Sequence, residues 1–115
     1  MSIHPTISSS KVEGTSVYNL AGEKLGAIDD LVIDKRNGHV RYVALEFGGF
    51  LGLGTDRFPL PWSMLTYDVE KDGYVVNLDM NQLKAGPRYP QDQRPVYSDD
   101  YGRGVDDYYG VPLGA

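Results

Sequence analysis

The sequence predicts a small all-β domain in which short strands, joined by tight turns, curl around one hydrophobic core. The composition favours short strands, because the 115 residues include 14 glycines and 7 prolines. The dipeptides Asn37-Gly38 and Asp72-Gly73 are hairpin signals, since these residue types tolerate positive φ. The chain length fits one domain, so we expect a single core.

The first two strands are predicted over residues 16–19 and 24–34. Between them, Gly22 can supply the positive φ of a tight turn. In the second strand, Asp29-Asp30 interrupts the alternation of apolar and polar residues. We therefore expect a β-bulge that places Ile28, Leu31 and Ile33 on one face.

The third strand, predicted over residues 39–47, is apolar on both faces. One face carries Val40, Tyr42 and Ala44, and the other carries Val43, Leu45 and Phe47. A strand buried on both sides in so short a chain implies that something covers the sheet outside the core. The C-terminal tail or a second subunit is expected to supply this cover.

The next segments predict an edge, a hairpin and one helical turn. Residues 57–62 contain two prolines, and proline donates no ladder hydrogen bond, so this stretch is an edge or a strand end. Residues 66–69 and 74–78 are expected to form the second hairpin. Asp79 can cap a helical turn that runs through Leu83. The bulky Phe47 and Trp62 are expected in or beside the core.

Composition divides the chain into three regions. Residues 1–10 form a polar leader, residues 11–89 form the β-rich body, and residues 90–115 form an acidic tail rich in tyrosine, glycine and proline. The proline and glycine content of the tail is associated with disorder, and we expect an extended segment without regular structure. Its four tyrosines combine an apolar ring with a polar tip, which suits them to docking on a surface: Tyr97, Tyr101, Tyr108 and Tyr109.

The residue types argue against enzymatic chemistry, and we expect no catalytic, cofactor-binding or metal-binding residues. The chain has no cysteine, and its two histidines, His4 and His39, lie far apart in the sequence. The glycine-rich segment 48–54 matches neither a P-loop nor a dinucleotide fingerprint. Asp29, Asp30 and Asp34 lie along one predicted strand, where they either face solvent or relay protons.

Charge and hydropathy restrict the partners that we expect. The formal net charge of −5 disfavours nucleic acid, because affinity for phosphates comes mainly from lysine and arginine. The N-terminus lacks the pattern of a signal peptide, and no stretch approaches about 18 consecutive apolar residues, so we expect no membrane span. We therefore expect a cytoplasmic protein.

The order of these segments resembles the PRC-barrel family, named after the cytoplasmic domain of the photosynthetic reaction centre H subunit. The resemblance spans roughly Val12 to Tyr89. It is carried by residues 17–19 with Gly22 and Leu25-Gly26, by residues 28–34 running into 38–43, and by Phe58-Pro59-Leu60-Pro61-Trp62. It implies a strongly bent barrel of about six antiparallel strands, here with a short helical turn and an extended C-terminal tail.

The resemblance to free-standing bacterial members implies a non-catalytic module for protein interaction or assembly, with an unidentified protein partner. Two alternatives remain open at this point. One is a membrane-associated regulator of electron or proton transfer similar to the H subunit, and the other is an accessory factor in RNA processing or ribosome maturation.

We expect this module to be a homo-oligomer, most simply a dimer. Phe50, Leu51 and Leu53 are large apolar residues among glycines, and such a loop left in water would be an exposed hydrophobic patch. The predicted interface therefore combines these three residues with the four tail tyrosines.

Overall fold

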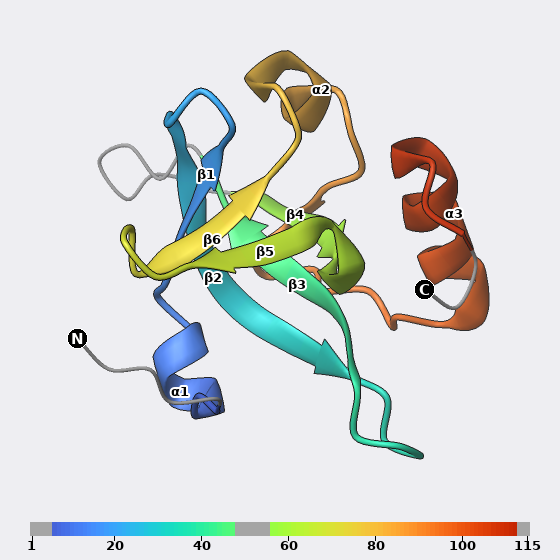
Figure 1. Ribbon diagram of the computed structural model, residues 1–115. Coiled ribbons are helices and arrows are strands. Elements are labelled where there is room, and N and C mark those ends of the chain that lie inside the picture. Colours follow the sequence, from blue (N-terminus) through green and yellow to red (C-terminus); the bar gives the residue numbers. More distant parts are fainter. Residues whose placement is uncertain (1–5, 48–55, 113–115) are drawn as a thin grey trace.

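The structure, a computed structural model, describes residues 6–47 and 56–112. Seven strands form one sheet: β1 (Ser16–Asn19), β2 (Lys24–Ile33), β3 (Val40–Glu46), β4 (Asp56–Pro61), β5 (Leu65–Asp68), β6 (Gly73–Val76) and β7 (Tyr89–Pro90). The helices are α1 (Ser9–Val12), α2 (Met80–Lys84) and α3 (Asp99–Tyr109), with a 3₁₀ turn, η2 (Trp62–Met64). Figure 1 shows their arrangement. The predicted all-β class is confirmed.

The strand order is β5-β6-β1-β2-β3-β4-β7, and two details differ from the prediction. The sheet contains a short seventh strand, β7, and β1 pairs with β6 in parallel, so the strands are not all antiparallel. The two terminal strands of this order do not pair with each other, so the described sheet is open rather than a closed barrel.

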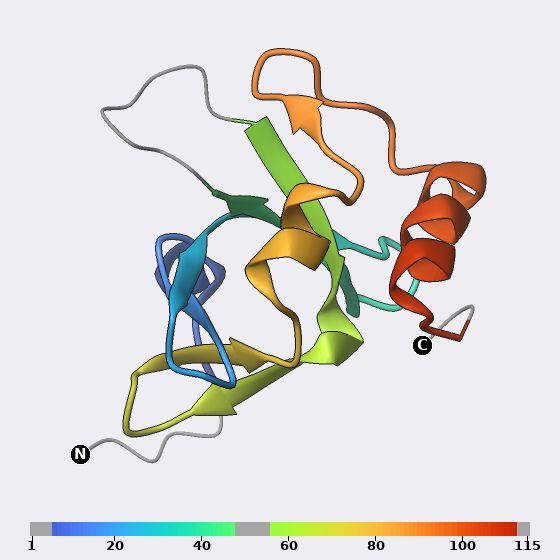
Figure 2. The same cartoon turned by 90° about the horizontal axis from the view of Figure 1, so that it is seen from above.

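The sheet nevertheless curls strongly. β4 lies near one end of the strand order and β5 lies at the other end, yet only the residues of η2 join them. A few residues span at most about 3.5 Å each, so the two ends of the sheet must approach one another. The view from above shows this curved, barrel-like arrangement (Figure 2).

The predicted bulge lies in β2. Ile28 pairs with Leu45 and Asp30 pairs with Ala44, which leaves Asp29 as the additional residue. The bulge is confirmed, but the expectation that Ile33 shares the buried face is wrong, because its side chain is 50% exposed. A second register shift at the end of β2 changes the direction of this side chain.

The turns follow the sequence signals. Gly38 has φ +78° in the β2–β3 hairpin, and the backbone N–H of Asp34 donates to the carbonyl of His39 at 2.8 Å. Asp72, with φ +48°, forms the β5–β6 turn. The side chain of Asp79 accepts a hydrogen bond from the backbone N–H of Gln82, so the predicted helix cap is confirmed.

The core occupies the concave side of the sheet, and β3 is buried on both sides. Its core members are Val12, Val17, Leu25, Ile28, Val43, Leu45, Phe58, Leu60, Tyr74, Val76, Leu78 and Leu83. Phe47 and Trp62 pack against this cluster while partly exposed, as predicted. On the opposite face of β3, Tyr42 and Ala44 are also buried.

The tail is the clearest departure from the prediction, because much of it is helical rather than extended. The Ser98 side chain accepts a hydrogen bond from the backbone N–H of Tyr101 at the start of α3, and Gly110 ends the helix with φ +69°. α3 stands beside β4 (Figure 1), and its Asp106 accepts a hydrogen bond from Tyr42 of β3. The tail of the same chain therefore covers the second apolar face of β3.

Candidate functional site

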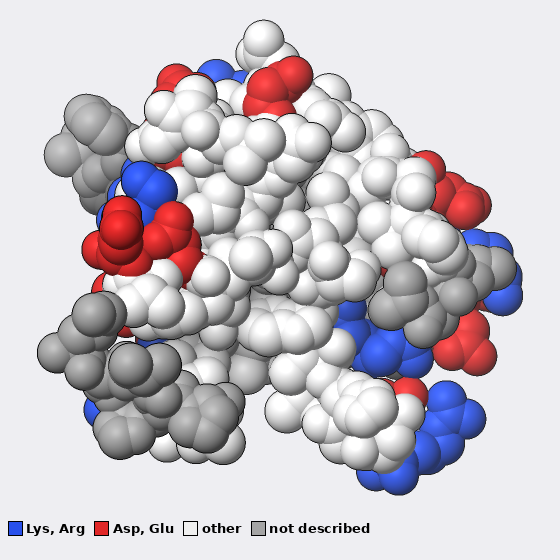
Figure 3. Space-filling model, in the orientation of Figure 1, with Lys and Arg blue, Asp and Glu red and all other residues white. Residues whose placement is uncertain are grey.

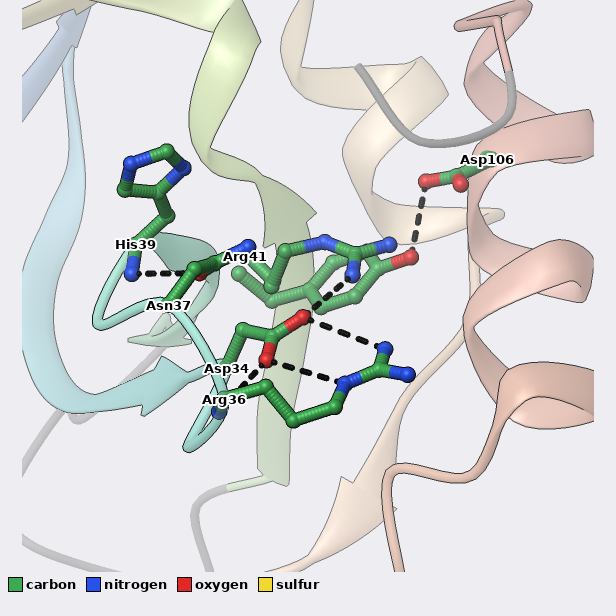
Figure 4. A network of polar contacts seen from close by, with 7 residues as sticks. Asp34, Arg36, Asn37, His39, Arg41 and Asp106 are labelled. Carbon is green, nitrogen blue, oxygen red and sulfur yellow. Dashed lines mark hydrogen bonds and ion pairs between the residues drawn. The ribbon is translucent and has the colours of Figure 1, made fainter.

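A notch of about 420 Å³ lies between the β2–β3 hairpin and α3. The hairpin contributes polar side chains from its end, including Asp34, Arg36 and Arg41. The tail contributes Tyr97 and the inner surface of α3, including Asp106. Figure 4 shows how the polar groups of this notch face one another.

Asp34 organises the hairpin side of the notch. Its side chain is 7% exposed, and it accepts hydrogen bonds from the Arg36 backbone N–H at 2.9 Å and from the Arg41 guanidinium at 3.2 Å. The Arg36 guanidinium lies 3.5 Å away. The backbone N–H of Arg36, followed by its side chain, lowers the pKa of Asp34. The carboxylate thus holds the hairpin turn together.

Tyr42 and Asp106 join the barrel to the tail helix. The Tyr42 hydroxyl donates to the Asp106 carboxylate at 3.0 Å, and both residues are buried. Burial, followed by the hydrogen bond to the Asp106 carboxylate, raises the pKa of Tyr42 to about 12. A buried carboxylate is costly without a donor, so this contact favours the docked position of α3.

The charges of the notch are largely satisfied within the chain. Its lining includes four cationic side chains, Lys35, Arg36, Arg41 and Arg103, and three carboxylates, Asp34, Asp99 and Asp106. Arg103 also pairs with Asp100 at 2.7 Å. Within residues 6–47 and 56–112, no group of three His, Asp or Glu side chains is placed to hold a metal ion. The arrangement is suited to holding two parts of the chain together.

The four predicted interface tyrosines all make contacts inside the chain. Tyr97 packs 5.8 Å from the Tyr42 ring, and its hydroxyl lies 2.8 Å from that of Tyr89. Tyr101 stacks edge-on against Tyr97 at 5.0 Å. The hydroxyl of Tyr108 donates to the carbonyl of Gln82 in α2.

Burial raises the pKa of Tyr97 and of Tyr109. Tyr108 keeps 38% of its surface exposed. Contact of the tyrosines with another chain stays a prediction.

The three strand acids each face an arginine. Asp29 accepts from the Arg57 guanidinium at 2.8 Å, and Asp30 lies 3.3 Å from Arg94 of the tail. Asp34 pairs with Arg36 and Arg41. All three carboxylates therefore form ion pairs within the chain. Arg57 and Arg94 were missed as partners because they are distant in sequence.

Two further predictions from the sequence concern the loop residues and His39. Phe50, Leu51 and Leu53 lie outside the described residues, so their predicted interface role stays a prediction. His39 is exposed in the hairpin, where its backbone N–H donates to the Asn37 side chain at 2.9 Å. It has the surroundings of a turn residue.

A largely apolar surface at the edge strand β5, with Asp68 as its one charged residue, was not anticipated. A hollow there is lined by Leu20, Met64, Thr66, Tyr67, Asp68, Val69, Val75 and Asn77. Leu20 is 69% exposed, and Tyr67 and Val69 are each 43% exposed. In Figure 3 the middle of the face that carries β5 and β6 is white, and charged side chains lie toward its margins. The alternation of residues 65–69 is too short to reveal this surface.

The search for membrane-crossing helices gives a negative result for the part of the chain that the structure describes. None of its helices has both the length and the hydropathy that a bilayer crossing requires.

The comparisons with known proteins agree with the segment order. The family model of the PRC-barrel domain matches residues 4–82, which is more than half of the chain. The chain belongs to the PRC-barrel family. The tail helix α3 follows the matched part of this PRC-barrel chain. No curated protein gives a significant match.

One similar solved structure is RimM, a candidate 16S ribosomal RNA processing protein from Pseudomonas aeruginosa. It is 20% identical, with a TM-score of 0.46, and the match covers 69% of this chain. The match covers 48% of the RimM chain, so this PRC-barrel protein corresponds to about half of it.

The close contact between α3 and Tyr42 predicts opposite effects of alanine at two glycines of the same helix. A Cβ at Gly102 would lie 2.5 Å from the Tyr42 hydroxyl oxygen, whereas a Cβ at Gly104 would meet no atom within 4 Å. Gly104→Ala should therefore stabilise the chain by about 0.5–1 kcal/mol through helix propensity. Gly102→Ala should destabilise it by about 1–3 kcal/mol through overpacking.

Urea unfolding of the two glycine variants measures both effects. Equal stabilisation by Gly102→Ala and Gly104→Ala would contradict the docked position of α3.

The hydrogen bond from Tyr42 to Asp106 predicts a pH-dependent loss of stability. Tyr42→Phe should cost about 1–3 kcal/mol near neutral pH, because the buried Asp106 loses its donor. The pKa of Tyr42 is raised from 10.0 to about 12 on folding, so its contribution is present below pH 10 and is lost between pH 10 and 12. The variant should lose less stability over that window than the wild type.

Urea unfolding across this pH range, with Tyr18→Phe on β1 as the control, tests the tyrosine prediction. The same pH dependence in Tyr42→Phe and the wild type would show that this hydroxyl does not titrate as proposed.

Proposed function

We propose that this PRC-barrel protein is a non-catalytic assembly module that acts by binding protein surfaces, with a homodimer as its simplest state. The observation that carries the proposal is the largely apolar surface at β5, where Leu20, Tyr67 and Val69 are substantially exposed. Exposed apolar side chains that gather in one place are typical of protein interaction sites.

The polar groups of the notch support a binding role rather than catalysis. An enzyme needs a nucleophile or base that can reach a reacting atom. Here the Tyr42 hydroxyl donates to Asp106, and the Asp34 carboxylate accepts from Arg36 and Arg41. These groups are engaged in contacts that fix the hairpin and the tail.

The alternative of a proton-transfer regulator draws no specific support from these carboxylates. Asp29 and Asp30 pair with arginines, which gives each carboxylate a structural contact within the chain. The net charge of −5 likewise disfavours nucleic acid as the partner. A cytoplasmic protein partner, including a second copy of the chain, fits the composition better.

The loop residues Phe50, Leu51 and Leu53 are proposed as one contact of the assembly, together with the exposed side of the tail tyrosines. The argument for the loop is its sequence, because large apolar side chains gain about 1.5–3 kcal/mol each when they are fully buried. Tyr108 supports a neighbouring contribution from the tail, since 38% of it is exposed.

Light scattering after size-exclusion chromatography tests the proposed assembly. The wild type should be oligomeric at about 10–50 µM, a concentration at which micromolar contacts are populated. Leu51→Asp with Leu53→Asp should weaken the assembly, so that on dilution its mass falls at a higher concentration than that of the wild type. Ile7→Asp with Val96→Asp is the matched control, because it adds the same charge at two exposed apolar positions.

A monomeric wild type at this concentration would contradict the assembly function. An unchanged dependence of the mass on concentration in the folded loop variant would show that the loop is not one of the contacts.

A further inference from the structure

We propose that the edge of β5 is an interface with a second copy of this chain, in which the two β5 strands pair antiparallel across a two-fold axis. This inference rests on the proposed assembly function and names both its partner and its surface. It uses only residues of the described body and does not involve the loop 48–54.

The first argument is the open edge. β5 pairs with β6 on one side, and within residues 6–47 and 56–112 no strand pairs with its other side. Edge strands are usually blocked by proline, by a bulge or by inward-pointing charge. β5 contains no proline, its pairing with β6 shows no register shift, and its one charged residue, Asp68, is the last of the strand. Its backbone can therefore extend the sheet.

The second argument is the surface beside this edge. Thr66 pairs with Val75 of β6, and Val75 pairs in register with Tyr18 of β1, so one row of uncharged side chains runs across three strands. Leu20 and Met64 line the same hollow. Pairing at the edge would bring two such rows together and would bury apolar surface in both chains at once.

The third argument is charge. Two identical chains with a net charge of −5 repel one another least where neither presents free charge, and a surface without free charge selects no oppositely charged partner. The carboxylate within the hollow belongs to Asp68. It accepts hydrogen bonds from the backbone N–H groups of Glu70 at 2.9 Å and Lys71 at 3.2 Å. Its charge is thus directed into the turn.

The alternation of side chains restricts the register of this pairing. In an antiparallel pair, residues directly opposite one another lie on the same face of the sheet. Because neighbouring residues along a strand lie on opposite faces, the two-fold axis must pass between the two copies of one residue. With Thr66 at the axis, Leu65 faces the second copy's Tyr67. The two Asp68 residues then lie about 13 Å apart along the strands, beyond the Debye length of about 8 Å at physiological salt.

Substituting Thr66, the residue at the two-fold axis, with residues of opposite charge tests this geometry. Thr66→Asp and Thr66→Lys each place like charges opposite one another, which should raise the dissociation constant of the homodimer at least about tenfold. Light scattering should then show the mass falling from twice 12.7 kDa toward 12.7 kDa. An equimolar mixture of the two variants should associate again, because opposite charges then face each other.

Three controls separate loss of pairing from loss of folding. Circular dichroism and thermal unfolding establish that both Thr66 variants are folded. Val96→Asp adds the same charge at a position that is 84% exposed in the tail, and it should remain dimeric.

The two proposals fail in different ways. A dimeric wild type with a dimeric, folded Thr66→Asp variant would overturn the edge pairing while the assembly function stands. Failure of the mixed variants to associate would also overturn it, because a partner other than a second copy does not supply the opposite charge. A monomeric wild type would overturn both proposals.

Discussion

The burial of β3 on both faces is the constraint on which the rest of the structure depends. Val43 and Leu45 face the core, while Tyr42 and Ala44 face the other way and are also buried. A sheet this small cannot bury both faces by itself, so a second layer is required. α3 supplies that layer, with Val105 buried at the contact. The tail is therefore part of the folded structure.

The polar contacts follow from this arrangement. Because α3 lies over Tyr42, the phenol hydroxyl is removed from water and needs an acceptor, which Asp106 provides. The segment that leads to α3 is held in the same way, since Arg94 pairs with Asp30 and Tyr97 meets Tyr89. The notch thus acts as a joint between barrel and tail.

The sequence predicted the local structure well because turns and caps depend on neighbouring residues. Gly38, the bulge at Asp29 and the cap at Asp79 were all readable from short patterns. The helix α3 was missed because its glycines and tyrosines are typical of irregular chain, and its stability comes from contact with β3. The parallel pairing of β1 with β6 is likewise a long-range contact that no local pattern encodes.

Native-state hydrogen exchange of the backbone amides tests the central claim, that the tail is the second layer over β3. If α3 is folded onto β3, the amides of its second half, including Val105 and Asp106, should open with free energies that approach those of β3. Exchange of these α3 amides at the rate of an unfolded peptide, while β3 stays protected, would show that β3 does not depend on the tail and would contradict this account.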